Sequence, residues 1–191
     1  MTKAIVFTAA PLLVTVYASF RVLDGLDGER GPGPAWTIGH LAFLAALILF
    51  VPVFLELRRL AGHGLFATAT AVVGLVGAVC SMAQICVDIV VGALAADHEA
   101  MRRMFADVKS VPGVPLVVYT VGPVLLYLGL LIMFCQLALT RAVPVWRAVA
   151  VVLAVLVSLL GLDALPAVGL LLCTGLAPFP CRNTSPATAQ S

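Results

Sequence analysis

Charged residues are scarce in this sequence, which has 11 Lys and Arg and 9 Asp and Glu among 191 residues. They make up 10% of the chain, whereas a soluble domain contains about a quarter. The 62% hydrophobic content is more than one soluble core of this length could bury. This composition excludes an ordinary soluble domain. The net charge of +2, with no basic patch, also indicates that nucleic acid is not a partner.

The motifs of common soluble enzymes are missing as well. None of the five cysteines forms a C-x-x-C pair, so neither thiol exchange nor a zinc centre is expected. The chain contains no nucleophile elbow, phosphate-binding loop, H-E-x-x-H or kinase signature. We therefore expect no metal, no cofactor and no soluble-type hydrolase chemistry. The sequence does not decide whether Cys173 and Cys181, which flank the end of the last apolar run, form a disulfide.

Long apolar runs take the place of these motifs. Residues 60–87 and 110–140 contain no Asp, Glu, Lys or Arg. About twenty apolar residues, rising about 1.5 Å each, cross the roughly 30 Å of hydrocarbon in a bilayer. We predict an all-α fold, a single integral membrane domain over residues 1–181 with five transmembrane helices. The predicted helices cover about 4–22, 35–57, 65–95, 114–139 and 147–177.

The first and last runs each allow a second interpretation. Residues 4–20 resemble a signal peptide, but the length of the run favours a retained helix. The last run carries Gly161, Asp163 and Pro166 near its middle. Two helices of about fifteen residues would each reach only about 22 Å, so we predict one helix that is kinked or broken at Asp163 to Pro166.

The connections predict a surface helix and an orientation. In residues 97–113, apolar side chains recur from Met101 to Val108 at helical spacing, with charges between them, which predicts an amphipathic helix on the membrane surface. Residues 182–191 are small and polar and are predicted to be disordered. We predict a multi-pass protein of a bacterial plasma membrane. Short basic turns favour an inside N-terminus, and five spans would then put the C-terminus outside.

Asp88 and Asp163 are the candidate catalytic residues, because a charge at the centre of a bilayer costs at least about 2.5–3.5 kcal/mol. Alternating helix directions bring His40, Asp88 and Tyr119 toward one membrane face, and Asp163 is expected to reach the same depth from the other face. Asp163 could alternatively cap a helix restarted at Pro166. The candidate ligand-binding residues are His40, Ser81, Gln84, Tyr119 and Tyr127.

These residues predict a membrane protein that contacts lipids and binds a small apolar or lipid-like molecule in a polar pocket within the membrane. Two acids there could add acid–base chemistry, such as isomerisation or cyclisation of an isoprenoid. One alternative is a proton-coupled transporter or efflux component that works as a homo-oligomer. Another is a non-catalytic accessory or immunity protein, in which the polar residues only hold helices together. The sequence leaves open whether the protein is an enzyme.

Overall fold

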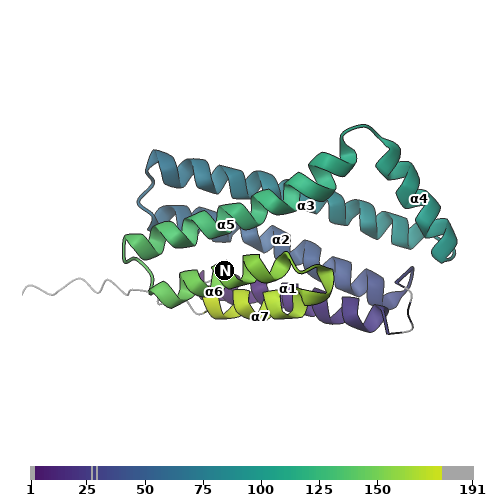
Figure 1. The fold of residues 1–191 in the computed structure, drawn as a ribbon, viewed down its shortest axis with the longest axis horizontal. Helices are drawn as coiled ribbons and strands as arrows, with labels where there is room; N and C mark the ends of the chain where they lie inside the picture. Colours follow the sequence, from purple (N-terminus) through teal and green to yellow (C-terminus); the bar gives the residue numbers. More distant parts are fainter. Residues whose placement is uncertain (1–2, 27, 29, 178–191) are drawn as a thin grey trace, which may run out of the picture.

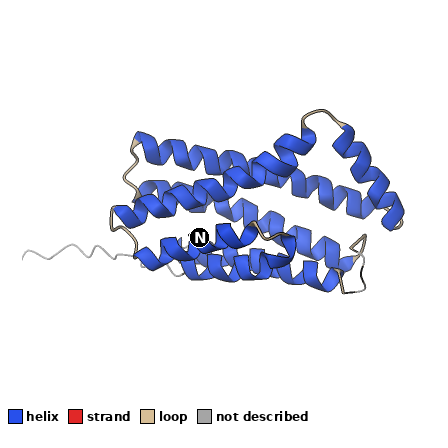
Figure 2. Cartoon of the chain, in the orientation of Figure 1, coloured by secondary structure: helices blue, strands red, loops and turns tan. Residues whose placement is uncertain are grey.

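The computed structural model describes residues 3–26, 28 and 30–177. All regular structure in these residues is helical, which confirms the predicted all-α fold (Figures 1 and 2). The predicted tail, 182–191, and Cys181 lie outside the described residues. In chain order the elements are α1 (Lys3–Asp24), α2 (Pro34–Leu60), α3 (Leu65–Leu94), α4 (His98–Ser110), the π-helix η1 (Pro115–Val121), α5 (Gly122–Leu139), α6 (Val145–Ser158), the 3₁₀ turn η2 (Leu162–Ala164) and α7 (Leu165–Leu176).

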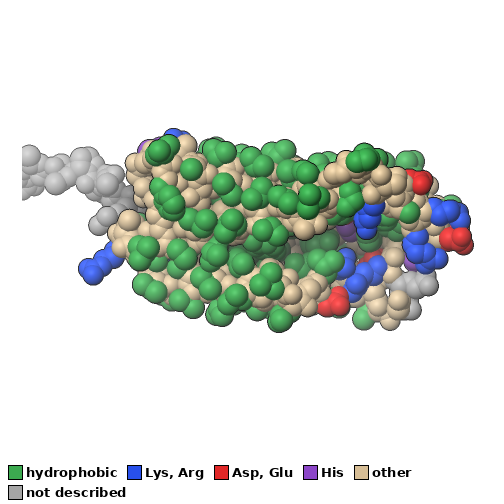
Figure 3. Space-filling model, turned by 45° about the horizontal axis from the view of Figure 1, so that its top comes forward, with side chains coloured by type: hydrophobic (Ala, Val, Ile, Leu, Met, Phe, Trp, Pro, Cys, Tyr) green, Lys and Arg blue, Asp and Glu red, His purple; other side chains and the backbone are tan. Residues whose placement is uncertain are grey.

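Four helical segments in the described residues are long and apolar enough to cross a membrane: α1, α2, α3, and η1 continued by α5. Their outward side chains are apolar as well, such as Ile48, Leu55 and Val79, which are 54%, 50% and 62% exposed. Most of the charged side chains visible in Figure 3 gather at one end of the molecule. A continuous apolar surface of this kind is unfavourable in water and suits a hydrocarbon environment.

The last apolar run is broken between Ser158 and Leu165, an interval that includes Asp163, but its two halves do not continue in one direction as a single membrane-spanning helix. It forms two helices, α6 with 14 residues and α7 with 12, which pack against each other as a hairpin. α6 ends at Ser158. In the turn that follows, Gly161 adopts a φ of 112°, a conformation that suits glycine. The length estimate assumed that each apolar helix must cross the membrane alone, whereas α7 instead packs along α1.

The two ends of this hairpin lie together. The Arg147 guanidinium, near the start of α6, donates from Nη1 to the carbonyl oxygens of Gly175 and Leu176 at the end of α7, over 3.3 and 3.5 Å. α7 therefore ends at the same end of the bundle at which α6 begins, and α1 also begins there (Figure 1). The described chain thus starts and ends at one end of the bundle, whereas five spans would place Lys3 and Leu176 at opposite ends.

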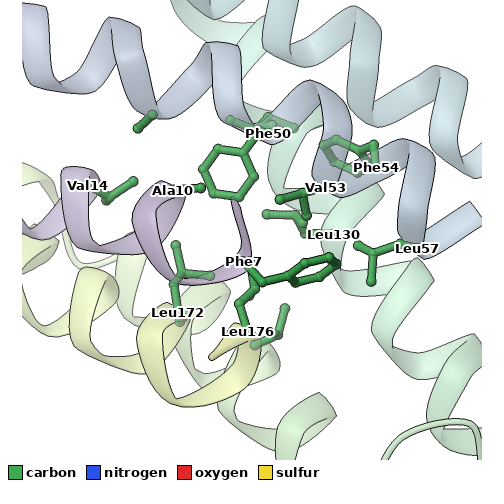
Figure 4. Close-up of a cluster of buried hydrophobic side chains, with 14 of the residues drawn as sticks. Phe7, Ala10, Val14, Phe50, Val53, Phe54, Leu57, Leu130, Leu172 and Leu176 are labelled. Carbon is green, nitrogen blue, oxygen red and sulfur yellow. The ribbon is translucent and has the colours of Figure 1, made fainter. Parts of the chain in front are cut away.

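The long helices and the hairpin form a closed ring around one core. Each helix packs against the next in the order α1, α2, α3, α5, α6 and α7, and α7 packs back onto α1. Phe7, Phe50, Leu130 and Leu172 come from four of these helices and meet inside the ring (Figure 4). Dense packing of this kind holds helices together in lipid, where the hydrophobic effect contributes little between them.

Glycines bring α3 and α5 into backbone contact. A Cβ atom on Gly77 would lie 2.2 Å from the amide nitrogen of Leu126, and one on Gly129 would lie 2.5 Å from the Cα of Gly74. No larger side chain fits these positions without a shift of the backbone. The close approach fixes how the end of α3 lies against η1, where the candidate site is found.

α4 leaves the bundle at an angle (Figure 1). Asp97 begins it as an N-cap, with its carboxylate accepting from the backbone N–H of Ala100 over 2.7 Å. Met101 is buried on the inner face, while Arg102 and Arg103 are exposed on the other. The amphipathic helix is therefore present within the predicted 97–113, and its location on a membrane surface remains a prediction.

Candidate functional site

Asp88 lies near the end of α3 with only 7% of its surface exposed. The Tyr119 hydroxyl donates to its Oδ1 over 3.2 Å. His40 Nε2, from α2, lies 3.9 Å from its Oδ2. The structure thus brings three of the sequence-predicted site residues together from three elements.

Trp36 completes this group, which we call the Asp88 cluster (Trp36, His40, Asp88 and Tyr119). The indole Nε1 donates to the backbone carbonyl of Asp88 over 3.1 Å, and the ring stacks on His40 with centroids 4.0 Å apart. His40 Nδ1 lies 2.7 Å from the carbonyl oxygen of Trp36. Because a carbonyl oxygen only accepts, Nδ1 carries a proton in this contact, and Nε2 is the nitrogen that faces Asp88.

The sequence did not predict Trp36 or Tyr17 beside these residues. Tyr17, from α1, meets the His40 ring edge-on at 5.3 Å and stacks on Phe43 at 4.6 Å. The i, i+4 spacing of Trp36 and His40, which places both on one helix face, could have identified Trp36. No comparable spacing points to Tyr17, because it comes from a different helix.

A π-helical turn positions Tyr119. Pro123 has no N–H to donate back to residue 119, and the N–H of Gly122 bonds instead to the carbonyl of Val117, five residues earlier. The Thr120 hydroxyl donates to the Pro115 carbonyl over the same spacing, at 3.1 Å. The widened turn at η1 thus carries the Tyr119 ring to Asp88.

Cations surround the buried carboxylate at longer range. Arg21 and Lys109 are close enough to act on Asp88 electrostatically. The Lys109 Nζ lies 5.4 Å from the centre of the Tyr119 ring and 5.9 Å from that of Phe105. Positive charge near the carboxylate offsets part of the cost of removing it from water.

Of the other predicted ligand-binding residues, only Gln84 reaches the Asp88 carboxylate in the described structure. Ser81 is buried, and its hydroxyl has no hydrogen-bond partner among the described residues. Tyr127 packs against the hydrophobic core, two helical turns beyond Tyr119.

Asp163 does not join Asp88. It lies in η2, at the turn of the α6–α7 hairpin, with 82% of its side chain exposed. Its carboxylate pairs with Arg30 of the α1–α2 connection over 2.6 Å. Asp163 therefore reaches the end of the bundle that carries the α1–α2 connection, but it is exposed there and does not share a buried pocket with Asp88.

Two spaces of very different size flank Trp36. On the side of Tyr17 and His40 the space measures only ≈10 Å³, about the minimum for one water molecule. On the other side a hollow of ≈360 Å³ lies between α4 and the α1–α2 connection, and we call it the α4 hollow. The residues that line the α4 hollow include Arg30, Trp36, His98, Met101, Arg102 and Phe105.

Within the described part of the chain, no three His, Cys, Asp or Glu side chains come together as a metal site requires. The α4 hollow presents aromatic and apolar side chains beside cationic ones.

The sequence matches no protein-family model, no curated protein and no solved structure.

Proposed function

We propose that the protein binds a small apolar or lipid-like molecule in the α4 hollow, next to the Asp88 cluster. The observation that carries this proposal is a hollow of ≈360 Å³ at the end of an apolar bundle, with Trp36, Met101 and Phe105 in its wall. Sites for small ligands typically measure about 300–1,000 Å³ and combine apolar walls with a few polar groups. The polar groups here include the guanidinium groups of Arg30 and Arg102.

Binding is a better-supported function than turnover. An acid–base mechanism with two carboxyl groups requires both near one substrate, yet Asp163 pairs with Arg30 and Asp88 lies behind the Trp36 ring. The Trp36 ring would have to move before a ligand in the α4 hollow could meet Asp88. We therefore propose that Asp88, His40 and Tyr119 hold the inner wall of the binding site.

The membrane arrangement that we propose has four spans and a short hairpin. The helices α6 and α7, at about 1.5 Å per residue, reach only about 21 and 18 Å, so the hairpin enters and leaves the bilayer from one side. The turns after α2 and after α5 are short and basic, as inside loops usually are, and we place their end of the bundle inside a bacterial plasma membrane. The basic residues of the described chain at that end are Lys3, Arg58, Arg59, Arg141 and Arg147.

Fluorescence of Trp36 provides a direct test, because the chain contains only two tryptophans. In the Trp146→Phe variant, Trp36 is the only emitter. A dibrominated monoacylglycerol, whose bromines quench indole on contact, should quench Trp36 in neutral detergent with a saturable dependence on concentration. The Trp36→Phe variant is the matched control, because Trp146 is 53% exposed near the opposite end of the bundle and should be quenched without saturation. Quenching of Trp36 that never saturates, with this probe and with its anionic counterpart, would overturn the proposal.

A second candidate function is that of a non-catalytic accessory membrane protein. The observation in its favour is that the Asp88 carboxylate already accepts a hydrogen bond from Tyr119, and the space beside Trp36 and His40 measures only ≈10 Å³. Under this hypothesis the Asp88 cluster only joins helices. Absence of saturable quenching at Trp36, together with a folded protein, would favour it.

A further inference from the structure

We propose that the ligand of the α4 hollow carries an anionic phosphate headgroup on an apolar tail. This inference rests on the proposed function and specifies its ligand class. The feature behind it is a pair of arginines, Arg30 and Arg102, that come from different elements and line the same hollow.

Arg102 is the more available of the two. It is exposed, and it makes no ion pair or hydrogen bond with another residue that the structure describes, although its neighbour Arg103 pairs with Glu99 over 2.7 Å. A guanidinium has five N–H donors in a planar fork that matches two oxygens of a phosphate. Arg102 therefore presents to the α4 hollow an anion-binding group that no described residue engages.

Arg30 is held in place by a weak partner. Its Nη2 bonds to Asp163 Oδ1 over 2.6 Å, and both side chains are substantially exposed. Exposed ion pairs are weak and exchange readily in water, so an anionic headgroup can compete with Asp163 for the Arg30 guanidinium. The N–H donors of Arg30 that do not face Asp163 can also bind the headgroup.

The wall between these arginines suits the first carbons of a tail. Met101 is 4% exposed, and the Trp36 and Phe105 rings lie edge to face with centroids 6.3 Å apart. Trp36 is in the first turn of α2, at the level where aromatic residues usually meet the headgroup region of a bilayer. Cations at the rim above an apolar wall match an amphiphile better than a free anion.

The experiment compares two dibrominated probes with the same acyl chain, a lysophosphatidic acid and a monoacylglycerol, in the Trp146→Phe background and neutral detergent. We expect the phosphate probe to half-saturate the quenching of Trp36 at a concentration at least about tenfold lower than the neutral probe. Arg102→Gln should bring this ratio close to one. Arg103→Gln is the matched control, because it removes the same charge one residue away and should leave the ratio unchanged.

The outcomes separate this inference from the proposed function. Equal affinity of the two probes, or an unchanged ratio in Arg102→Gln, would overturn the phosphate headgroup while leaving the binding site intact. Saturation by neither probe would overturn both. Displacement of the phosphate probe by inorganic phosphate, as effective as by the unbrominated lysophosphatidic acid, would support a phosphate site but contradict the lipid assignment. Helix content by circular dichroism is compared for all variants, so that only folded proteins are interpreted.

Discussion

At the scale of single residues, Asp88 is tolerated in an apolar helix because its polar atoms meet groups from other elements. Tyr119 donates to the carboxylate, His40 faces its second oxygen, and Trp36 donates to the backbone carbonyl. An unpaired charge at this depth would cost several kcal/mol. The Asp88 cluster therefore joins α2, α3 and η1 at one end of the ring.

Removing the Tyr119 hydroxyl should weaken this junction. We expect Tyr119→Phe to lower the free energy of unfolding by about 0.6 to 1.7 kcal/mol, the range for hydrogen bonds between membrane helices. Asp88→Leu should cost more, because it leaves Tyr119 and His40 without the carboxylate. Unfolding of each variant and of the double mutant in a denaturing detergent, analysed as a double-mutant cycle, measures the coupling.

Tyr127→Phe is the matched control for this experiment. The Tyr127 hydroxyl makes no hydrogen bond with the described residues, and its ring packs against the core. A loss of stability in Tyr119→Phe no greater than in Tyr127→Phe, or a coupling energy near zero, would show that the hydrogen bond to Asp88 contributes nothing.

The sequence could predict part of this site. Alternating helix directions fix the depth of a residue, so the order of the apolar runs is enough to assign His40, Asp88 and Tyr119 to one membrane face. Depth does not fix which helices are neighbours, so Trp36 and the α4 hollow could not be predicted. The exposure of Asp163 could not be predicted either, because a continuous helix would have kept it inside the bundle, whereas the chain turns back at this residue.

At the scale of helices, the glycine contact between α3 and α5 can be tested separately. Gly129→Ala would place a Cβ 2.5 Å from the Cα of Gly74, so the two helices must move apart. Overpacking of this kind costs about 1–3 kcal/mol, and we expect a clearly lower midpoint of thermal unfolding in detergent. Gly64→Ala is the control, because a Cβ there meets no atom within 4 Å and it should leave the midpoint nearly unchanged. Equal midpoints for the two variants would contradict the close contact of α3 and α5.

Hydropathy predicts helices better than it predicts their partners. The long apolar runs could be assigned to helices because a helix satisfies its own backbone hydrogen bonds without water. Gly161 and Pro166 signalled an interruption, but the angle after an interruption depends on tertiary contacts. Here the contact is Gly169 of α7 against the backbone of Thr15, which lets α7 lie along α1.

At the scale of the whole molecule, the hairpin determines the side on which the chain ends. Arg147 links the start of α6 to the end of α7, so this hairpin returns to the side from which it starts. Four long apolar segments precede it, and under the proposed arrangement they bring the chain back to the side on which α1 begins. The turn between α2 and α3, the turn between α5 and α6, and the C-terminus are therefore all expected inside, and α4 outside.

Cysteine labelling tests this arrangement in the full chain. In a background without the native cysteines, we expect a membrane-impermeant maleimide to label Glu99→Cys in intact cells, because Glu99 is exposed on α4. His63→Cys, Arg141→Cys and Ser191→Cys should react only after the membrane is permeabilised. A chain with five spans would expose Ser191→Cys together with Glu99→Cys in intact cells and would contradict the hairpin. Labelling of His63→Cys, Arg141→Cys and Ser191→Cys in intact cells, with Glu99→Cys protected, would reverse the orientation but keep the hairpin, because both ends of the chain would still share one side.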